Sequence, residues 1–378
     1  MQYRKFGKTG ADVSVLGFGC MRFPMAADNK VNEQKAIKML HEAMDGGLNY
    51  LDTAYIYHDG FSEVVTGKAL KNGYRDKAYV ATKSPTWHIK NEGDFDRFLD
   101  EQLKRLDIDY IDFYHLHCLG ADLWDNVVQK FDLIGKAEKA LKVGKIKHLG
   151  FSFHDDLSVF KRIVDAYDKW AFCLLQLNYL NEMTQAGLEG MKYAADKGLG
   201  IVGMGPLMGG RLSNPHPAVM KTLKDARPDW SATEWALNYV WDMPEVSLFL
   251  SGMSSTTQLR QNLASADKAR PHMLSDHEKA VIKTVQQQFE AIKSVPCTGC
   301  NYCLPCPAGV DIPRNFSIYN ELAAFEAEEV SKDAYAWMRS ENSKNTAENC
   351  TQCGACEPVC PQHIKIAELL AEVAKAFA

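Results

Sequence analysis

The sequence contains no long hydrophobic run and no excess of positive charge, and each absence excludes a class of protein. No stretch of about 18 apolar residues occurs, so we expect no transmembrane helix and no membrane partner. The 43 basic and 48 acidic residues give a net charge of −5, which argues against a nucleic-acid partner because phosphate binding needs a basic surface. The first residues lack the apolar segment of a signal peptide, and we therefore expect a cytoplasmic protein.

Cysteines, in contrast, are present in a distinctive order. Eight of the eleven fall into two runs near the C-terminus, and each run is followed by a proline. Two residues separate most successive cysteines, which is typical of loops that wrap an iron–sulfur cube. Because disulfides are rare in the cytosol, we interpret the runs as metal ligands. The predicted ligands are Cys297, Cys300, Cys303 and Cys306 in the first run, and Cys350, Cys353, Cys356 and Cys360 in the second.

The two runs together predict a module with two [4Fe–4S] clusters. The second run fits the bacterial ferredoxin pattern, whereas the first has only two residues before Cys306, where the pattern has three. In two-cluster ferredoxins the fourth cysteine of each run ligates the other cluster. By that rule Cys360 joins the first three cysteines of the first run, and Cys306 joins those of the second. A single cluster, with the shorter run degenerate, and a zinc site are the alternatives.

Ahead of the cysteine runs, short apolar segments alternate with amphipathic ones. Continuous apolar strands are typical of a parallel sheet that is covered on both faces. Residues 36–44, 137–141 and 160–167 repeat apolar side chains at helical spacing, and the two Ser-x-x-Glu sequences that begin at Ser231 and Ser275 predict helix starts. The eight expected strands include or end in residues 13–17, 51–53, 80–83, 114–117, 149–152, 175–178, 202–204 and 250–252.

Eight strand–helix units predict a closed (β/α)8 barrel, the TIM barrel of the α/β class, rather than an open sheet. Residues 3–10 predict a hairpin that closes the barrel floor. We expect the barrel to occupy residues 1–293. A small α-helical, ferredoxin-like iron–sulfur domain is expected over residues 294–378, with a helical insertion between its cysteine runs.

Polar residues follow the second, third and fourth expected strands, where a barrel of this kind places its chemistry. They are Asp52, Tyr57, Lys83 and His117. Tyr55 and His115 are competing candidates, because each lies two residues earlier and alternation along a strand does not reject it.

These four residues resemble the catalytic tetrad of the aldo-keto reductases, and family spacing selects Tyr57 and His117 over the competitors. The sequences at residues 16–22, 144–152 and 252–262 are similar to the first strand, the fifth-strand entry and the adenosine-phosphate loop of that family. The whole chain resembles the subgroup with a ferredoxin-like C-terminal domain. The resemblance implies an NAD(P)H-dependent oxidoreductase whose substrate is a small-molecule aldehyde or ketone.

The chemistry of the four residues can also be argued directly. Reduction of a carbonyl by hydride leaves negative charge on oxygen, so a proton donor is needed beside it. The pKa of an ordinary tyrosine is about 10, and a neighbouring ammonium lowers it. We therefore expect Lys83 to lower the pKa of Tyr57, Asp52 to hold Lys83, and His117 to donate a hydrogen bond to the carbonyl.

The family resemblance also implies a nicotinamide dinucleotide, NADP or NAD, across the barrel mouth. Phe153 replaces a usual asparagine and Met204 a frequent stacking tyrosine, and the adenosine loop lacks the basic residue usual for NADP. The choice between NADP and NAD therefore stays open, and reduced stacking leaves room for a flavin. The implied contacts are Gly19, Cys20, Met21, Ser152, Gln176, Met204, Gly209, Gly210, Leu212, Gly252, Ser254, Gln258 and Asn262.

The combination of barrel and clusters leaves three hypotheses for function. The first is carbonyl reduction with Tyr57 as proton donor, in which the clusters stabilise the domain or serve a redox partner protein bound there. The second is an electron-transfer enzyme whose clusters feed a flavin or an unusual substrate at the barrel mouth. The third is a non-catalytic redox sensor that a partner protein reads.

Overall fold

The computed structural model describes residues 1–325 and 328–378 and divides the chain into two compact units. The first unit is Met1–Pro206 with Ala236–Leu274, and the second is Leu207–Trp235 with Ser275–Ala378. The domain boundary expected after residue 293 stays a prediction. No helix of the described residues is both long and apolar enough to cross a membrane.

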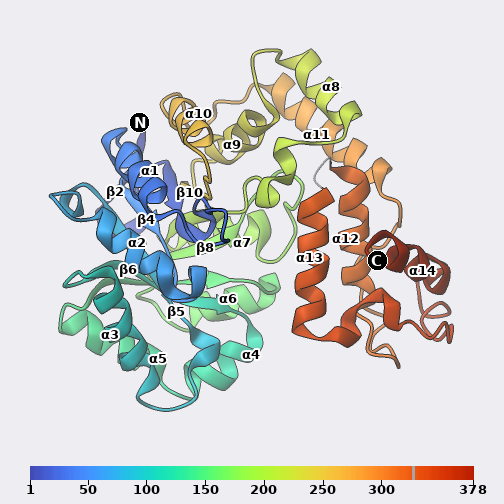
Figure 1. Cartoon of the computed structure of the whole chain (residues 1–378), viewed down its shortest axis with the longest axis horizontal. Helices are drawn as coiled ribbons and strands as arrows, with labels where there is room; N and C mark the ends of the chain where they lie inside the picture. Colours follow the sequence, from blue (N-terminus) through green and yellow to red (C-terminus); the bar gives the residue numbers. More distant parts are fainter. Residues whose placement is uncertain (326–327) are drawn as a thin grey trace. The chain divides into compact units, whose positions relative to one another are not determined.

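The first unit contains a closed barrel of eight parallel strands, as the sequence predicts, with helices around it (Figure 1). Neighbouring strands pair in the order β10-β3-β4-β5-β6-β7-β8-β9. The register places Asp52 beside Ala81 and Lys83 beside His115, which brings the ends of successive strands together. The barrel strands are β3 (Leu16–Gly19), β4 (Tyr50–Asp52), β5 (Tyr79–Ser84), β6 (Ile111–Leu119), β7 (Ile146–Phe153), β8 (Phe172–Gln176), β9 (Gly200–Met204) and β10 (Val246–Ser251).

Capping side chains mark the starts of several helices. The Asn32 side chain accepts a hydrogen bond from the Lys35 amide at the start of the first helix, and Ser275 with Glu278 forms the capping box predicted from sequence. The helices are α1 (Glu33–Asp45), α2 (Phe61–Ala69), α3 (Asp94–Leu106), α4 (Ala121–Leu123), α5 (Leu133–Lys142), α6 (Leu157–Asp165), α7 (Gly187–Asp196), α8 (Pro217–Ala226), α9 (Ala232–Asp242), α10 (Thr256–Ala266), α11 (Asp276–Ile292), α12 (Ile312–Ala324), α13 (Glu328–Glu341) and α14 (Ile366–Ala376).

The expected hairpin is present as β1 (Tyr3–Lys5) paired antiparallel with β2 (Asp12–Ser14). Phe6 lies between the two strands of the hairpin and is fully buried. The centre of its ring is 4.8 Å from that of Phe113 and 5.4 Å from that of Phe172. A Cβ at Gly200 would come within 2.3 Å of the Phe6 ring, so that position requires glycine. The hairpin therefore fills the barrel where the strands begin, and leaves the carboxyl ends of the strands for chemistry.

The second unit has its own hydrophobic core. Phe316 of α12, Tyr335 of α13 and Leu370 of α14 pack with Val295, and several cysteines of both runs pack against this core. The helical insertion predicted between the cysteine runs is present as α12 and α13. The loops that carry the cysteines are thus anchored on a helical scaffold.

Candidate active site and cluster site

Lys83 is the centre of a buried polar group at the carboxyl ends of β4 and β5. Its side chain is 1% exposed, and its ammonium forms an ion pair with Asp52 and donates to the carbonyl oxygen of Thr53 at 2.7 Å. The Nζ atom lies 4.9 Å from the centre of the Tyr57 ring. Burial lowers the pKa of Lys83, but Asp52 and Tyr57 together raise it by more than burial lowers it. The net pKa of Lys83 therefore lies above the ordinary value. The ammonium stays protonated.

Tyr57 begins a 3-10 turn, η3 (Tyr57–Gly60), after β4. Tyr57 is half-buried, and desolvation raises its pKa above the ordinary value while Lys83 lowers it. The sequence-based expectation of a net lowering is therefore wrong for this structure, because desolvation of the phenolate outweighs the ammonium. Without ligands, Tyr57 is a protonated phenol, the form required of a proton donor.

His117 is aimed by an irregularity in β6. The strand register shifts between Leu116 and Leu119, Cys118 has a positive φ of 61°, and Ser152 Oγ accepts a hydrogen bond from the Cys118 amide at 2.7 Å. Such bulges re-aim side chains beside active sites. The His117 ring lies 6.3 Å from the Tyr57 ring, between centroids. Burial, with Lys83 and His154, holds the pKa of His117 well below 6.5, so the imidazole is neutral.

The two competing candidates have different surroundings. The Tyr55 hydroxyl donates to Glu101 Oε2 of α3 at 2.7 Å, a contact that ties it to an outer helix. His115 lies against the polar group, with Nε2 3.6 Å from Asp52 Oδ2. Both ring nitrogens of His115 and this Asp52 oxygen are buried without a hydrogen-bond partner in the described structure. Sequence reasoning rejected His115 as a catalytic group and did not foresee its contact with Asp52.

A buried network supports the backbone of Lys83, and sequence reasoning missed it. The amide of Gln102 donates to the carbonyl oxygen of Lys83 at 3.0 Å and to Glu63 Oε1 at 2.7 Å. Glu63, fully buried on α2, also accepts from Thr82 at 2.7 Å and from Arg105 at 3.1 Å. Arg105 in turn donates to the Tyr55 carbonyl oxygen at 3.0 Å. The network thus fixes the main chain at Lys83 and at Tyr55, which lies two residues before Tyr57.

The residues expected to contact the nicotinamide lie at the ends of several strands. Gly19 ends β3, Met21 is exposed, and Cys20 is buried close enough to Asp52 and Lys83 for their charges to affect its pKa, which burial raises to about 12. Ser152 of β7 is buried and already holds the bulge of β6. Gln176 and Met204 are register partners at the ends of β8 and β9, and both are half-buried.

The expected adenosine-end residues gather before and within α10. Ser254 donates through its amide (2.9 Å) and its hydroxyl (3.2 Å) to Gln258 Oε1, and Ser255 caps the helix. Asn262 is buried and donates to Ser251 Oγ at 3.0 Å, which gives it a structural contact. Gly252 follows β10, and a Cβ there would lie 3.2 Å from the Arg22 side chain. The helix start offers amides and a favourable dipole for an anion.

Gly209, Gly210 and Leu212 belong to the second compact unit, in the turn η7 (Met208–Ser213). Gly209 has a φ of 71° and Gly210 a φ of 106°, and Leu212 is fully buried. Glycine adopts such φ values at no steric cost, so Gly209 and Gly210 allow this turn.

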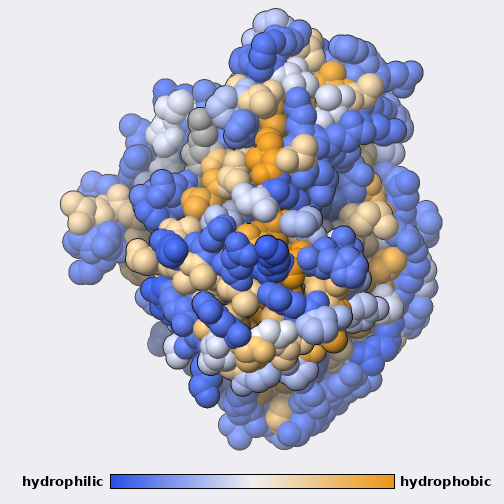
Figure 2. All heavy atoms as spheres, turned by 90° about the vertical axis from the view of Figure 1, so that its right-hand side faces the viewer, coloured by the Kyte–Doolittle hydropathy of each residue, from blue (hydrophilic) through white to orange (hydrophobic). Residues whose placement is uncertain are grey.

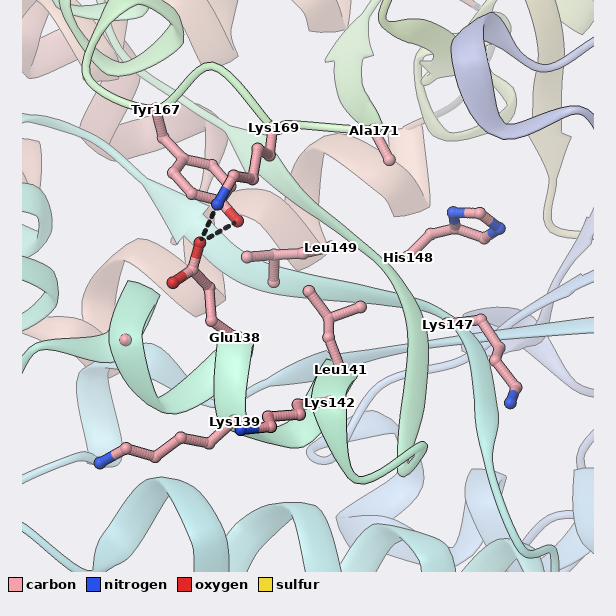
Figure 3. Close-up of a pocket in the computed structure, with 11 residues that line it drawn as sticks. Glu138, Lys139, Leu141, Lys142, Lys147, His148, Leu149, Tyr167, Lys169 and Ala171 are labelled. Atoms are coloured by element: carbon pink, nitrogen blue, oxygen red, sulfur yellow. Dashed lines mark hydrogen bonds and ion pairs between the residues drawn. The ribbon is translucent and has the colours of Figure 1, made fainter.

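An open hollow of about 650 Å³ lies away from the tetrad, where β7 and β8 begin (Figure 3). Lys139, Lys142 and Lys147 are among the residues that line it. Lys169 and Tyr167 contact Glu138 at 2.8 and 3.2 Å. The hollow lies on the side of the strands where this fold places no chemistry, and none of the four predicted catalytic residues lines it.

The cysteines of the two runs interleave. Burial raises the pKa of Cys297, and the neighbouring thiols of Cys300 and Cys360 raise it further. Burial likewise raises the pKa of Cys356, with contributions from Cys350 and Cys306. Cys356 also acts on Cys303, so the two runs lie close together, and the crossed assignment of their cysteines to two clusters stays a prediction.

Within residues 1–325 and 328–378, no three His, Cys, Asp or Glu side chains gather closely enough to surround one metal ion. An iron–sulfur cube instead binds its four thiolates through four irons, so its ligands stand farther apart.

Cys300 and Cys353 are exposed, as are Tyr302 and Val359. Figure 2 shows orange, hydrophobic residues at the surface of the side it presents.

Comparisons with known proteins agree with both parts of the chain. Residues 15–282 match the sequence model of the aldo/keto reductase family, and residues 296–364 match that of the 4Fe-4S dicluster domain. An L-galactose dehydrogenase of Arabidopsis thaliana is 30% identical over 291 residues, which cover 70% of this chain and 88% of that protein. An uncharacterized oxidoreductase of Bacillus subtilis is 26% identical over 325 residues, which cover 78% of this chain and 100% of that protein.

Solved structures show the same similarity for the barrel. An aldo-keto reductase from Bacillus halodurans in its holo form is 28% identical with a TM-score of 0.61, covering 75% of this chain and 96% of that chain. An aldo/keto reductase from Klebsiella pneumoniae in complex with NADP and acetate is 26% identical with a TM-score of 0.61, covering 75% of this chain and 95% of that chain.

Proposed function

Because this chain belongs to the aldo/keto reductase family and carries a 4Fe-4S dicluster domain, we propose that it reduces an aldehyde or a ketone with a nicotinamide dinucleotide. The observation that carries this proposal is the buried Lys83 ammonium between the Asp52 carboxylate and the Tyr57 ring. A protonated phenol beside a buried ammonium is suited to deliver a proton where negative charge develops on oxygen.

Each residue of the tetrad has a distinct part in the proposed reaction. Tyr57 donates its proton to the carbonyl oxygen, and Lys83 stabilises the phenolate that remains. Asp52 holds the ammonium in place and balances its charge. His117, which is neutral because its pKa lies well below 6.5, donates a hydrogen bond that orients the carbonyl without adding charge.

The proposed cofactor is NADPH, which would supply a hydride to the carbonyl carbon and leave as NADP⁺. NADP in the Klebsiella pneumoniae structure supports this choice over NAD. Among the residues of this chain, the amide of Gln176 and the hydroxyl of Ser152 would hold the carboxamide, and the start of α10 would bind the adenosine phosphates. Arg260 is already paired with Glu42, so Arg22, beside Gly252, is the more available basic residue at that end.

We further propose that the C-terminal domain binds two [4Fe–4S] clusters with crossed ligands. The first would use Cys297, Cys300, Cys303 and Cys360, and the second Cys350, Cys353, Cys356 and Cys306. Thiols stay reduced in the cytosol and are then free to bind iron, which agrees with the expected cytoplasmic location.

Electron transfer is the second candidate function, and the exposure of Cys300 and Cys353 favours it. A small redox protein could approach a cluster closely at these cysteines, beside the exposed Tyr302 and Val359. Because a cluster moves one electron and a hydride carries two, this function needs a flavin or an equivalent carrier between them.

One experiment separates the two candidates. Anaerobically purified protein is mixed with NADPH and a panel of aldehydes and ketones, while absorbance follows both NADPH and the clusters. Carbonyl-dependent oxidation of NADPH by flavin-free protein, without a change in the cluster spectrum, supports carbonyl reduction. Bleaching of the clusters by NADPH in protein that contains flavin supports electron transfer. Failure of every carbonyl to stimulate NADPH oxidation by iron-loaded protein would count against the first proposal.

A further inference from the structure

The turn η7, which follows β9, holds one residue with a side chain, Met208, in a backbone conformation that favours glycine. Met208, Gly209 and Gly210 have φ values of 49°, 71° and 106°. Glycine adopts this region freely, but a side chain such as that of Met208 is disfavoured there by about 1–2 kcal/mol. The guanidinium of Arg211 holds the turn by donating to the Met208 carbonyl oxygen at 3.1 Å. A turn of this kind needs support from outside.

That support comes from α12, which lies between the two cysteine runs in the sequence. Arg211 forms an ion pair with Glu321 at 2.7 Å, and the two side chains are only 14% and 21% exposed. Partly buried charges of this kind are costly to separate, because each loses its water on burial and depends on the other. The single guanidinium of Arg211 therefore joins the glycine turn to the iron–sulfur domain.

The chain continues along the end of α12 after the turn. Pro215 forms an antiparallel bridge with Phe325, and the His216 amide donates to the Ala324 carbonyl oxygen at 3.1 Å. The rings of Phe325 and Phe289 lie 5.1 Å apart between centroids. Residues 208–216 thus contact the C-terminal end of α12 through an ion pair, a backbone hydrogen bond and a β-bridge.

The neighbour of Glu321 connects the same helix to the first cysteine run. The buried Asn320 side chain donates to the Val295 carbonyl oxygen at 2.8 Å and accepts from the Val295 amide at 2.8 Å. Val295 is fully buried and precedes Cys297 by two residues. Two consecutive residues of α12 therefore hold the glycine turn on one side and the start of the cysteine run on the other.

We propose that the iron–sulfur domain positions the glycine turn through Arg211 and Glu321, so that an intact, iron-loaded domain is required for tight binding of the dinucleotide. This inference rests on the proposed function, because the family resemblance places Gly209 and Gly210 among the residues that contact its dinucleotide. Arg211 and Glu321 are positioning residues, because they act through the turn. Loss of the clusters loosens the chain at Val295, which Asn320 of α12 holds. The end of α12 then becomes less fixed, and the glycine turn loses the support that Glu321 gives it.

The test uses full-length, anaerobically purified protein and four variants. Arg211→Gln and Glu321→Gln each break the pair, and the double variant tests whether they act through one contact. Glu341→Gln is the matched control, because Glu341 pairs with Arg314 between α12 and α13 at 2.6 Å without contacting the turn. NADPH affinity is measured by fluorescence titration, and hydrogen exchange is followed over residues 207–216. Iron content is measured for every sample.

We expect both single variants to weaken NADPH binding about tenfold, equivalent to about 1.4 kcal/mol, with little change in kcat. Exchange over residues 207–216 should quicken, the double variant should match the singles, and Glu341→Gln should match the wild type. Iron-stripped wild type should show the same two changes. Unchanged affinity and exchange in iron-loaded Glu321→Gln would overturn the inference.

If the wild type fails to bind NADPH, the proposed function fails, and exchange over residues 207–216 alone decides the role of the pair. Faster exchange in Glu321→Gln but not in Glu341→Gln then supports positioning by α12. Equal exchange in both variants refutes it.

Discussion

The Lys83 ammonium lies 4.9 Å from the centre of the Tyr57 ring, where it opposes the rise in pKa that burial imposes on the phenol. The relationship gives a first prediction. Tyr57→Phe keeps the ring and removes the proton, so kcat/KM for carbonyl reduction should fall by about 10²–10⁴. Steady-state kinetics with the best carbonyl substrate measures the effect.

The matched control for this variant is Tyr55→Phe. Tyr55 donates to Glu101 on an outer helix, so the loss of its hydroxyl should leave kcat/KM within about threefold of the wild type, while the thermal midpoint falls slightly. Equal activities for the two variants would contradict the assignment of Tyr57 as proton donor.

The ion pair between Lys83 and Asp52 gives a second prediction, about stability. Both side chains are at most 2% exposed, so Asp52→Asn leaves a buried ammonium without its counter-charge. Removal of one partner of a buried pair typically costs about 3–5 kcal/mol of unfolding free energy. Chemical denaturation of the iron-loaded protein measures this loss of unfolding free energy. If unfolding has more than one transition, the first is compared between the variant and the wild type.

A second aspartate–lysine pair provides the control. Asp45 and Lys77 lie 2.7 Å apart and are each about half exposed. Exposed pairs of this kind contribute about 0–1 kcal/mol, so Asp45→Asn should shift the midpoint little. A similar loss in both variants would mean that burial does not strengthen the Asp52 contact.

The fold was predictable from the sequence because its determinants are local. Each barrel strand is a short apolar run, and the polar residue that ends a strand falls at the same rim as its neighbours. The order of residues along the chain is therefore enough to place Asp52 and Lys83 together, and the structure confirms that they form an ion pair.

The rest of the site depends on contacts that no local pattern reveals. The sequence gives no sign that Glu63 of α2 is special, yet it is fully buried and accepts hydrogen bonds from residues of two other elements, β5 and α3. The bulge at Cys118 has no residue signature, since that position is not glycine. The net pKa of Tyr57 differs from the sequence-based expectation for the same reason. A sequence shows which charge is near, but it does not show how much water burial removes.

The pKa directions at the site give a third prediction, for pH dependence. Burial, with Lys83 and His154, keeps the pKa of His117 well below 6.5, and burial raises the pKa of Tyr57 above its ordinary value. Reduction needs neutral His117 and protonated Tyr57, so kcat/KM should be flat from about pH 7 to 9. It should decrease only at alkaline pH, as Tyr57 loses its proton.

A pH profile of carbonyl reduction, with enzyme stability checked at each pH, tests this directly. The reverse oxidation needs the phenolate as base, so its rate should instead rise toward alkaline pH. A strong inflection near pH 6.5 in the reduction profile would show that His117 titrates in the working range, contrary to its buried, neutral state in the structure.

The interleaved cysteines give the last prediction, which concerns cluster ligation. If ligation is crossed, Cys300 and Cys360 serve one cluster, and Cys306 serves the other. Cys300→Ala and Cys360→Ala should each lower iron from about eight to about four per chain, and the double variant should keep about four. Cys300→Ala combined with Cys306→Ala should remove nearly all iron, because it damages both clusters. Iron and sulfide analysis after identical anaerobic reconstitution compares the two double variants. The opposite result, with iron retained in the second pair and lost in the first, would show that each run holds its own cluster.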